Sequence, residues 1–109
     1  MQERKSLFAL AAEPKLTIWK GLDKRPLAVG PNMRIDEFFF DEGVEANSHT
    51  HTNEEAGYVV AGEFEVQLGD ESRYIGPGDA WSVPAGLVHG VKCLRSGSYV
   101  VATLVASAQ

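Results

Sequence analysis

Two stretches decide the fold of this chain. The first reads GVEANSHTHTNEEAGYVVAG at residues 43–62, and the second reads GDAWSVPAGLVHGVKC at residues 78–93. Together they contain all three histidines of the sequence. Each begins with a glycine and has further glycines at positions where the chain can turn. Because two gapped patterns of this length seldom arise by chance, we interpret the histidines as members of one metal site, awaiting its structural context.

The spacing of His49 and His51 suits joint binding of one ion. Side chains two positions apart on an extended strand project from the same face, so both rings can reach the same point. Glu55 keeps this parity, but the segment at 52–54 can turn or bulge, so parity alone does not place its carboxylate at the ion. Imidazole and carboxylate suit iron(II), manganese, nickel or zinc, and three His with one Glu leave coordination positions open for water or substrate.

The two motifs resemble those of the cupins, over about half of the chain. The resemblance implies an all-β fold, a small double-stranded β-helix or jelly-roll barrel, whose turns are shaped by the motif glycines and proline. It also implies that His49, His51, Glu55 and His89 are the metal ligands. Cys93 stands where the family motif often has Asn. That position is not a ligand in the family, so the substitution concerns only local packing or hydrogen bonding.

Length and composition fit one domain spanning residues 1–109, with N-terminal strands in 1–42 and the metal-binding motifs at 43–62 and 78–93. A chain of 109 residues with 44% hydrophobic residues can bury a modest core, and a homodimer would bury further apolar surface. The formal charge of −5 and the pI near 5.1 argue against nucleic acid or an anionic membrane as a partner. The single cysteine, Cys93, and the lack of a long apolar run predict a soluble, cytoplasmic protein.

Closely spaced turn signals predict short strands, as in a sandwich or barrel. The expected strands are Leu16–Trp19, Met33–Phe40, Ala56–Ala61, Phe64–Leu68, Ala80–Val83, Val88–Leu94 and Tyr99–Ala106. A hairpin across Gly69-Asp70 is expected to pair the fourth of these with residues 72–75. The last strand is apolar on both faces apart from Thr103, which suggests burial between the barrel and a partner copy.

Further candidates for chemistry come from aromatic and charged residues near the motifs. Phe38, Phe40, Tyr58 and Trp81 are candidate pocket walls, although aromatic residues at strand spacing also form ordinary cores. Arg34, Asp36 and Glu37 lie on the strand before the first motif, where an inward side chain would bind a substrate carboxylate or move a proton. The alternative for these three is a solvated face. Our candidate catalytic residues are Glu55, Arg34, Glu37 and Tyr58.

Residues 49–58 and 62–66 are locally similar to the small single-domain cupins of pectin degradation. Those proteins act on unsaturated uronates and promote conversion to the linear keto form. In that group a Gln commonly replaces Glu55, and catalysis is associated with Asp, Phe and Arg near the C-terminus. The matching segment here, Tyr99–Ala106, contains none of the three.

Two classes of function follow. The first is a metal-dependent enzyme acting on a small, oxygen-rich organic acid or sugar derivative, by isomerisation or ring opening or, with iron, by dioxygenation. The second is a non-catalytic cupin that binds or senses a small molecule. Such sensors are usually fused to a DNA-binding or signalling domain, and this sequence shows no such segment, which favours the enzyme.

Overall fold

The computed structural model describes residues 7–11 and 14–105, and this part of the chain forms eight strands and no helix. In order they are β1 (Leu16–Trp19), β2 (Leu22–Val29), β3 (Met33–Phe40), β4 (Glu45–His49), β5 (Glu55–Leu68), β6 (Glu71–Ile75), β7 (Ala80–Val83) and β8 (His89–Leu104). Within the described residues, no helix is available to cross a membrane. The antiparallel pairing confirms the predicted all-β fold.

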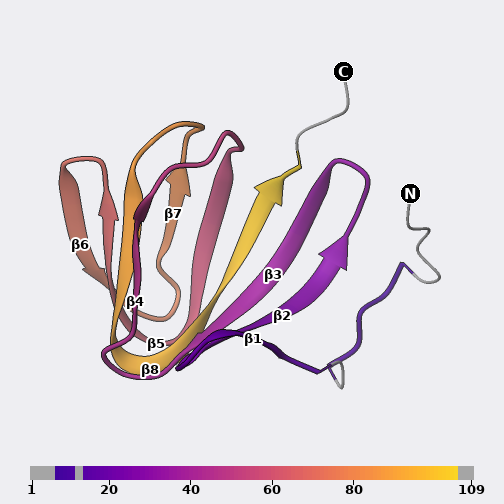
Figure 1. Cartoon of the computed structure of the whole chain (residues 1–109), viewed down its shortest axis with the longest axis horizontal. Coiled ribbons are helices and arrows are strands. Elements are labelled where there is room, and N and C mark those ends of the chain that lie inside the picture. The colour runs from indigo at the N-terminus through magenta and orange to yellow at the C-terminus, as the bar shows by residue number, and fades with distance from the viewer. Residues whose placement is uncertain (1–6, 12–13, 106–109) are drawn as a thin grey trace.

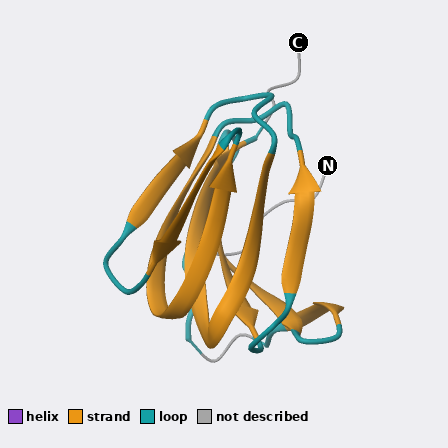
Figure 2. Ribbon diagram, turned by 90° about the vertical axis from the view of Figure 1, so that its left-hand side faces the viewer, coloured by secondary structure: helices purple, strands orange, loops and turns teal. Residues whose placement is uncertain are grey.

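The strands form two layers joined by β5 and β8, which are long enough to belong to both. In the first layer, the order β1-β2-β3-β8-β5-β7 uses residues 98–103 of β8 and 55–61 of β5. In the second layer, the order β4-β8-β5-β6 uses residues 89–95 of β8 and 63–68 of β5. Both long strands bend sharply where the layers meet (Figure 1), and the layers then face one another (Figure 2).

Two glycines make this bend possible. Gly62 has φ of +83°, a conformation that costs an ordinary L-residue strain. Gly97 lies against the backbone of Ala61 and Gly62, with no room for a Cβ. The pairing of β5 with β8 shifts register between Val59 and Phe64, as in β-bulges that bend a strand. The strands expected at Ala56–Ala61 and Phe64–Leu68 are therefore one strand, β5, bent at Gly62, and the last two expected strands are one strand, β8, bent at Gly97.

β2 and β4 were absent from the predicted strands. β2 contains three charged residues and Pro26, which normally argue against an interior strand, but Pro26 lies beside the irregular step in the β2–β3 pairing. β4 is short and polar, and it pairs with β8 around an irregular step between Ala46 and His49. β8 ends at Leu104, and the predicted strand end at Ala106 lies outside the described residues.

An aromatic cluster fills the space between the layers at the bend. Tyr99 contacts Phe40, Phe64 and Trp81, with ring centroids 5.1–5.3 Å apart. Such tilted and edge-to-face pairs add roughly 0.5–1.5 kcal/mol each beyond the area they bury. Phe64 is fully buried in this cluster, whereas Phe40, Trp81 and Tyr99 also line a cavity.

Candidate metal centre and cavity

The three histidines come from two neighbouring strands and one loop of the second layer. His49 is the last residue of β4 and pairs directly with His89, the first residue of β8. His51 lies just beyond the end of β4, not on an extended strand as the parity argument assumed. Its carbonyl accepts a hydrogen bond of 2.8 Å from the amide of Gly86, which anchors the loop to the Pro84-Ala85-Gly86 turn.

The rings nevertheless converge as predicted. Their centroids are 4.4–4.9 Å apart in all three pairs. One ring nitrogen from each of His49, His51 and His89 lies within 4.8 Å of the other two, so this group could hold a metal ion. Nitrogens that each lie about 2 Å from one shared ion are at most about 4 Å apart, so binding needs at most a small closing movement of the rings.

The orientation of the His89 ring leaves its Nε2 atom available to bind a metal ion. Nδ1 lies 3.0 Å from the carbonyl oxygen of Leu87, and because a carbonyl only accepts, Nδ1 must carry the hydrogen. In the neutral ring Nε2 then presents a lone pair, the tautomer that metal-binding histidines commonly adopt. The Nε2 atoms of His51 and His89 are both buried, and neither has a hydrogen-bond partner among the described residues.

Glu55 lies at the start of β5 in the first layer and faces the histidines from across the interior. Its Oε2 is 3.1 Å from Nε2 of His89, without hydrogen-bond geometry. A carboxylate oxygen and a nitrogen lone pair at this distance repel each other unless a proton or a cation lies between them. Both side chains are largely buried, so solvent screens this repulsion weakly. The donor set therefore fits a divalent cation.

A cavity of about 350 Å³ opens from this group. Trp81, Phe38, Phe40 and Tyr99 line its wall, together with the three histidines and Glu55. Three of the four predicted aromatic walls are thus confirmed by position. A mostly apolar cavity with a few convergent polar groups is the usual form of a small-molecule site.

Arg34 and Asp36 also line the cavity, from β3. The guanidinium binds both carboxylate oxygens of Asp36, through Nε and one terminal nitrogen, each at 2.8 Å. This hydrogen bond is the main cause that raises the pKa of Arg34, and it keeps Asp36, which is 4% exposed, paired in a buried position.

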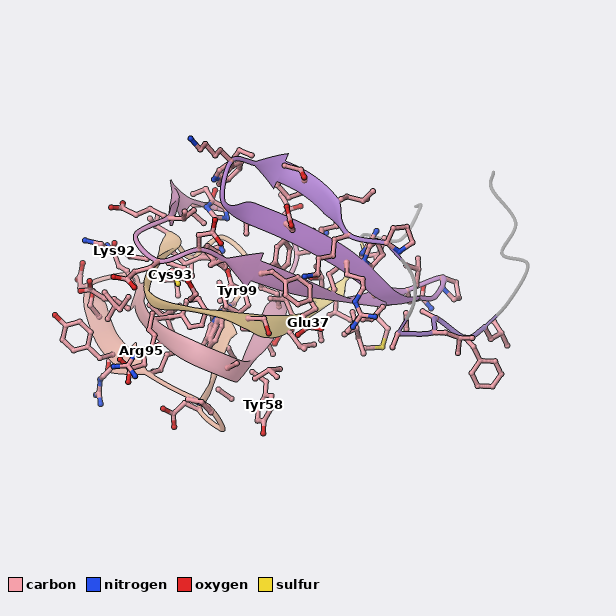
Figure 3. All side chains as sticks on the ribbon, turned by 90° about the horizontal axis from the view of Figure 1, so that it is seen from below. Glu37, Tyr58, Lys92, Cys93, Arg95 and Tyr99 are labelled. Carbon is pink, nitrogen blue, oxygen red and sulfur yellow. The ribbon has the colours of Figure 1, made fainter. Side chains whose placement is uncertain are left out.

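Glu37 and Tyr58, the other two catalytic candidates, do not line the cavity. Glu37 points to the opposite face of β3, where it accepts hydrogen bonds from Ser98 at 2.7 Å and from Arg25 at 3.2 Å. Tyr58 is 52% exposed and points away from the interior (Figure 3). For Glu37, alternation along β3 explains this outward direction. The even-numbered side chains from Arg34 to Phe40 face the cavity, so Glu37 faces the other way.

Tyr99 is a neutral phenol in the cavity wall. Burial raises its pKa far above the ordinary value, and the neighbouring carboxylate of Glu55 raises it further. At neutral pH its hydroxyl therefore keeps its proton and can donate a hydrogen bond.

Sequence reasoning missed Lys24 of β2, which lines the cavity near Phe38, its partner in the β2–β3 register. It also missed Thr103 and Trp19, which line the same cavity. Alternation within residues 33–40 places Arg34 and Asp36 on one face and Glu37 on the other, but apolar residues on both faces hide which of them lines the cavity. No comparable signal marks Lys24, because the run that contains it is interrupted by Pro26.

Comparison with known sequences and structures identifies relatives of this chain. Residues 37–105, more than half of the chain, match the sequence family described as "Cupin domain". The pectin degradation protein KdgF of Dickeya dadantii is 35% identical over 84 residues, which is 76% of each chain.

Solved structures share the fold over most of the chain. KdgF from a Halomonas species is 31% identical, with a TM-score of 0.84 over 91% of this chain and 93% of that one. An RmlC-like cupin from Shewanella frigidimarina is 26% identical, with a TM-score of 0.89 over 93% and 92% of the two chains.

Proposed function

Since this chain belongs to the cupin family, we propose that it is a divalent-metal-dependent enzyme acting on a small, oxygen-rich organic acid, with unsaturated uronates from pectin as the preferred class. The proposed reaction is isomerisation or ring opening of the sugar acid. One observation carries the proposal: the Nε2 atoms of His51 and His89 are buried without a hydrogen-bond partner among the described residues, and that of His89 lies 3.1 Å from the Glu55 carboxylate at the same cavity.

His49, His51 and His89 would hold the ion as neutral nitrogen ligands, and Glu55 would be its anionic ligand. An ion bound there supplies Lewis acidity toward the vicinal oxygens of a substrate. Iron, manganese, nickel and zinc all suit this donor set. Similarity to KdgF proteins supports the uronate class and favours ring opening over dioxygenation.

The chain's own residues provide the groups for proton transfer. Glu55, when not bound to the ion, can accept a proton from the substrate. Tyr99 can donate a hydrogen bond to a substrate oxygen, because its raised pKa keeps it protonated. The aromatic wall around Trp81 excludes water from the reacting atoms.

β3 provides an Arg, an Asp and a Phe to this cavity, the residue types that the C-terminal segment lacks. Arg34, Asp36 and Phe38 line the space in alternation, whereas β8 contributes Tyr99 and Thr103 there. We propose that Arg34, held by Asp36, contacts the substrate directly. The Arg, Asp and Phe that the pectin-degradation cupins have near the C-terminus would then come from β3 here, the strand that pairs with β8.

The experiment replaces His51 with Ala. After chelation and dialysis, we expect the wild-type protein to regain about one divalent ion per chain by mass spectrometry. The variant should lose most of that metal while its circular dichroism stays unchanged, because the aromatic core does not include His51. Exposed Thr50, the residue before His51, provides the matched control as Thr50→Ala.

Turnover is then measured on unsaturated uronate monomers, released from pectate by a lyase, through loss of their ultraviolet absorbance. The metal-loaded protein should consume them, and the His51→Ala protein should be slower by at least about 100-fold. Full metal in the dialysed variant would contradict the ligand set. Metal binding without turnover of any uronate would instead favour a non-catalytic binding cupin.

We also propose that the protein forms a cytoplasmic homodimer. Met33, Tyr58, Val60 and Leu104 are exposed apolar residues on the face of the first layer opposite the cavity. A second copy packed on this face would bury them. The buried thiol of Cys93 supports a reducing compartment.

A further inference from the structure

Four charged side chains line the cavity: Lys24, Arg34, Asp36 and Glu55. Their formal charges cancel, but their surroundings differ. Asp36 is paired with Arg34 through two hydrogen bonds of 2.8 Å. Glu55 lies beside His89 in the proposed ligand set. Of these four charged side chains, Lys24 is therefore the one without such a neighbour.

Lys24 has no carboxylate at ion-pair distance anywhere in residues 7–11 or 14–105. It is partly buried, and it lies opposite Phe38 in a wall that also includes Leu22 and Trp19. Lysine rarely lines an apolar wall without a partner, because its ammonium group loses part of its hydration there. An anionic group on a ligand would supply the missing partner.

The first and second layers place Lys24 and the histidines on different walls of one cavity. Lys24 comes from β2 of the first layer, whereas His49 and His89 come from β4 and β8 of the second. A ligand that fills the cavity can present oxygens to the histidine group and a separate anionic group to Lys24. A divalent ion at the histidines would add positive charge and strengthen the preference for an anion.

We propose that Lys24 determines specificity by binding the carboxylate of the ligand, while Arg34 is restrained by Asp36. This inference rests on the proposed ligand class and deepens it: the ligand is a monocarboxylate whose acid group lies apart from the oxygens facing the histidines. The ammonium donates hydrogen bonds to the carboxylate, a charge-assisted contact stronger than one to a neutral hydroxyl.

The test compares two ligands that differ only at the acid group, D-galacturonate and D-galactose. Dissociation constants are measured by ligand-observed NMR on zinc-loaded protein. The wild-type protein should prefer galacturonate. Lys24→Met should raise the Kd for galacturonate about tenfold and change that for galactose less than about twofold. Lys24→Arg keeps the charge and should retain the preference.

Lys92→Met is the matched control, because Lys92 is an exposed lysine of β8 outside this cavity (Figure 3). It makes the same change in net charge and should leave both constants unchanged. Zinc content and thermal unfolding are measured for every variant, so a misfolded or metal-free protein is recognised.

Two results would overturn the assignment of Lys24: a wild-type protein without preference for galacturonate, or a Lys24→Met protein that keeps it. An equal loss of affinity for both sugars in Lys24→Met would also contradict it. Failure of uronate turnover with an intact, Lys24-dependent preference would remove the proposed reaction and leave this site standing. Normal uronate turnover with an unchanged preference in Lys24→Met would support the proposed reaction and remove the assignment of Lys24.

Discussion

A backbone carbonyl sets the role of His89 in this site. By accepting a hydrogen from Nδ1, the oxygen of Leu87 orients the ring and leaves Nε2 as the lone-pair atom that faces Glu55. The Leu87 amide in turn lies 3.2 Å from the carbonyl of Pro84, so the Pro84-Ala85-Gly86 turn holds the whole arrangement. The glycine and proline of the second motif thus act on the metal site through the conformation of this turn.

Cys93, at the end of the second motif, is a buried structural thiol. It is fully shielded from solvent, and its Sγ lies 3.2 Å from the carbonyl oxygen of Arg95 (Figure 3). Burial is the main cause that raises its pKa. The folded protein therefore keeps this proton at pH values where an unfolded thiol, with an ordinary pKa of about 8.5, has lost it.

This shift predicts a pH-dependent contribution of Cys93 to stability. The contribution is complete below about pH 8.5 and decreases as the pH rises further, by at most about 1.4 kcal/mol per pH unit. The unfolding free energies of wild type and Cys93→Ala, measured in urea, should therefore converge between pH 7 and pH 9.5. A constant difference between the two proteins across this range would show that the thiol titrates alike in both states.

At the scale of the elements, the bend shared by β5 and β8 brings the two layers together. Gly97 lies directly against the backbone of Ala61, so Gly97→Ala must displace one strand from the other. We expect a loss of roughly 2–3 kcal/mol in the free energy of unfolding, measured from urea transitions.

Gly78→Ala separates this steric effect from a purely conformational one. Gly78 has φ of +91°, but no atom lies within 4 Å of the position that a Cβ would occupy. Its replacement should cost only about 1 kcal/mol of backbone strain. Equal effects of the two substitutions would argue against a close approach of the β5 and β8 backbones at Gly97.

For the whole molecule, the two faces of the first layer have different roles. The inner face lines the cavity, and the outer face carries exposed apolar residues that include Tyr58 and Val60. We expect a dimer by size-exclusion chromatography with light scattering. Tyr58→Glu should shift it toward monomer, because a charge would be buried at the interface.

Tyr74→Glu is the control for this shift. Tyr74 is exposed on β6, in the second layer, away from the proposed interface. It should leave the dimer intact. A monomeric wild-type protein, or equal dissociation by both substitutions, would contradict an interface at Tyr58.

Local sequence patterns were sufficient to predict the fold family and the histidine group. The spacing of the two motifs predicted the cupin fold and placed His49, His51 and His89 together, because turns and short strands of fixed length carry them. By contrast, Gly62 and Gly97 have the same local signature in a turn and in a bent strand, and only the pairing of β5 with β8 distinguishes the two.

The inward or outward direction of the remaining candidates depended on the tertiary structure. Strands with apolar residues on both faces specify their register weakly, so the sequence left Arg34, Glu37 and Tyr58 equivalent. Pairing of β3 with β8 turned Arg34 into the cavity and Glu37 away from it. Lys24 joined the site only through pairing of β2 with β3. The sequence by itself determined the fold family and the histidine group, whereas long-range strand pairing decided which charges face them.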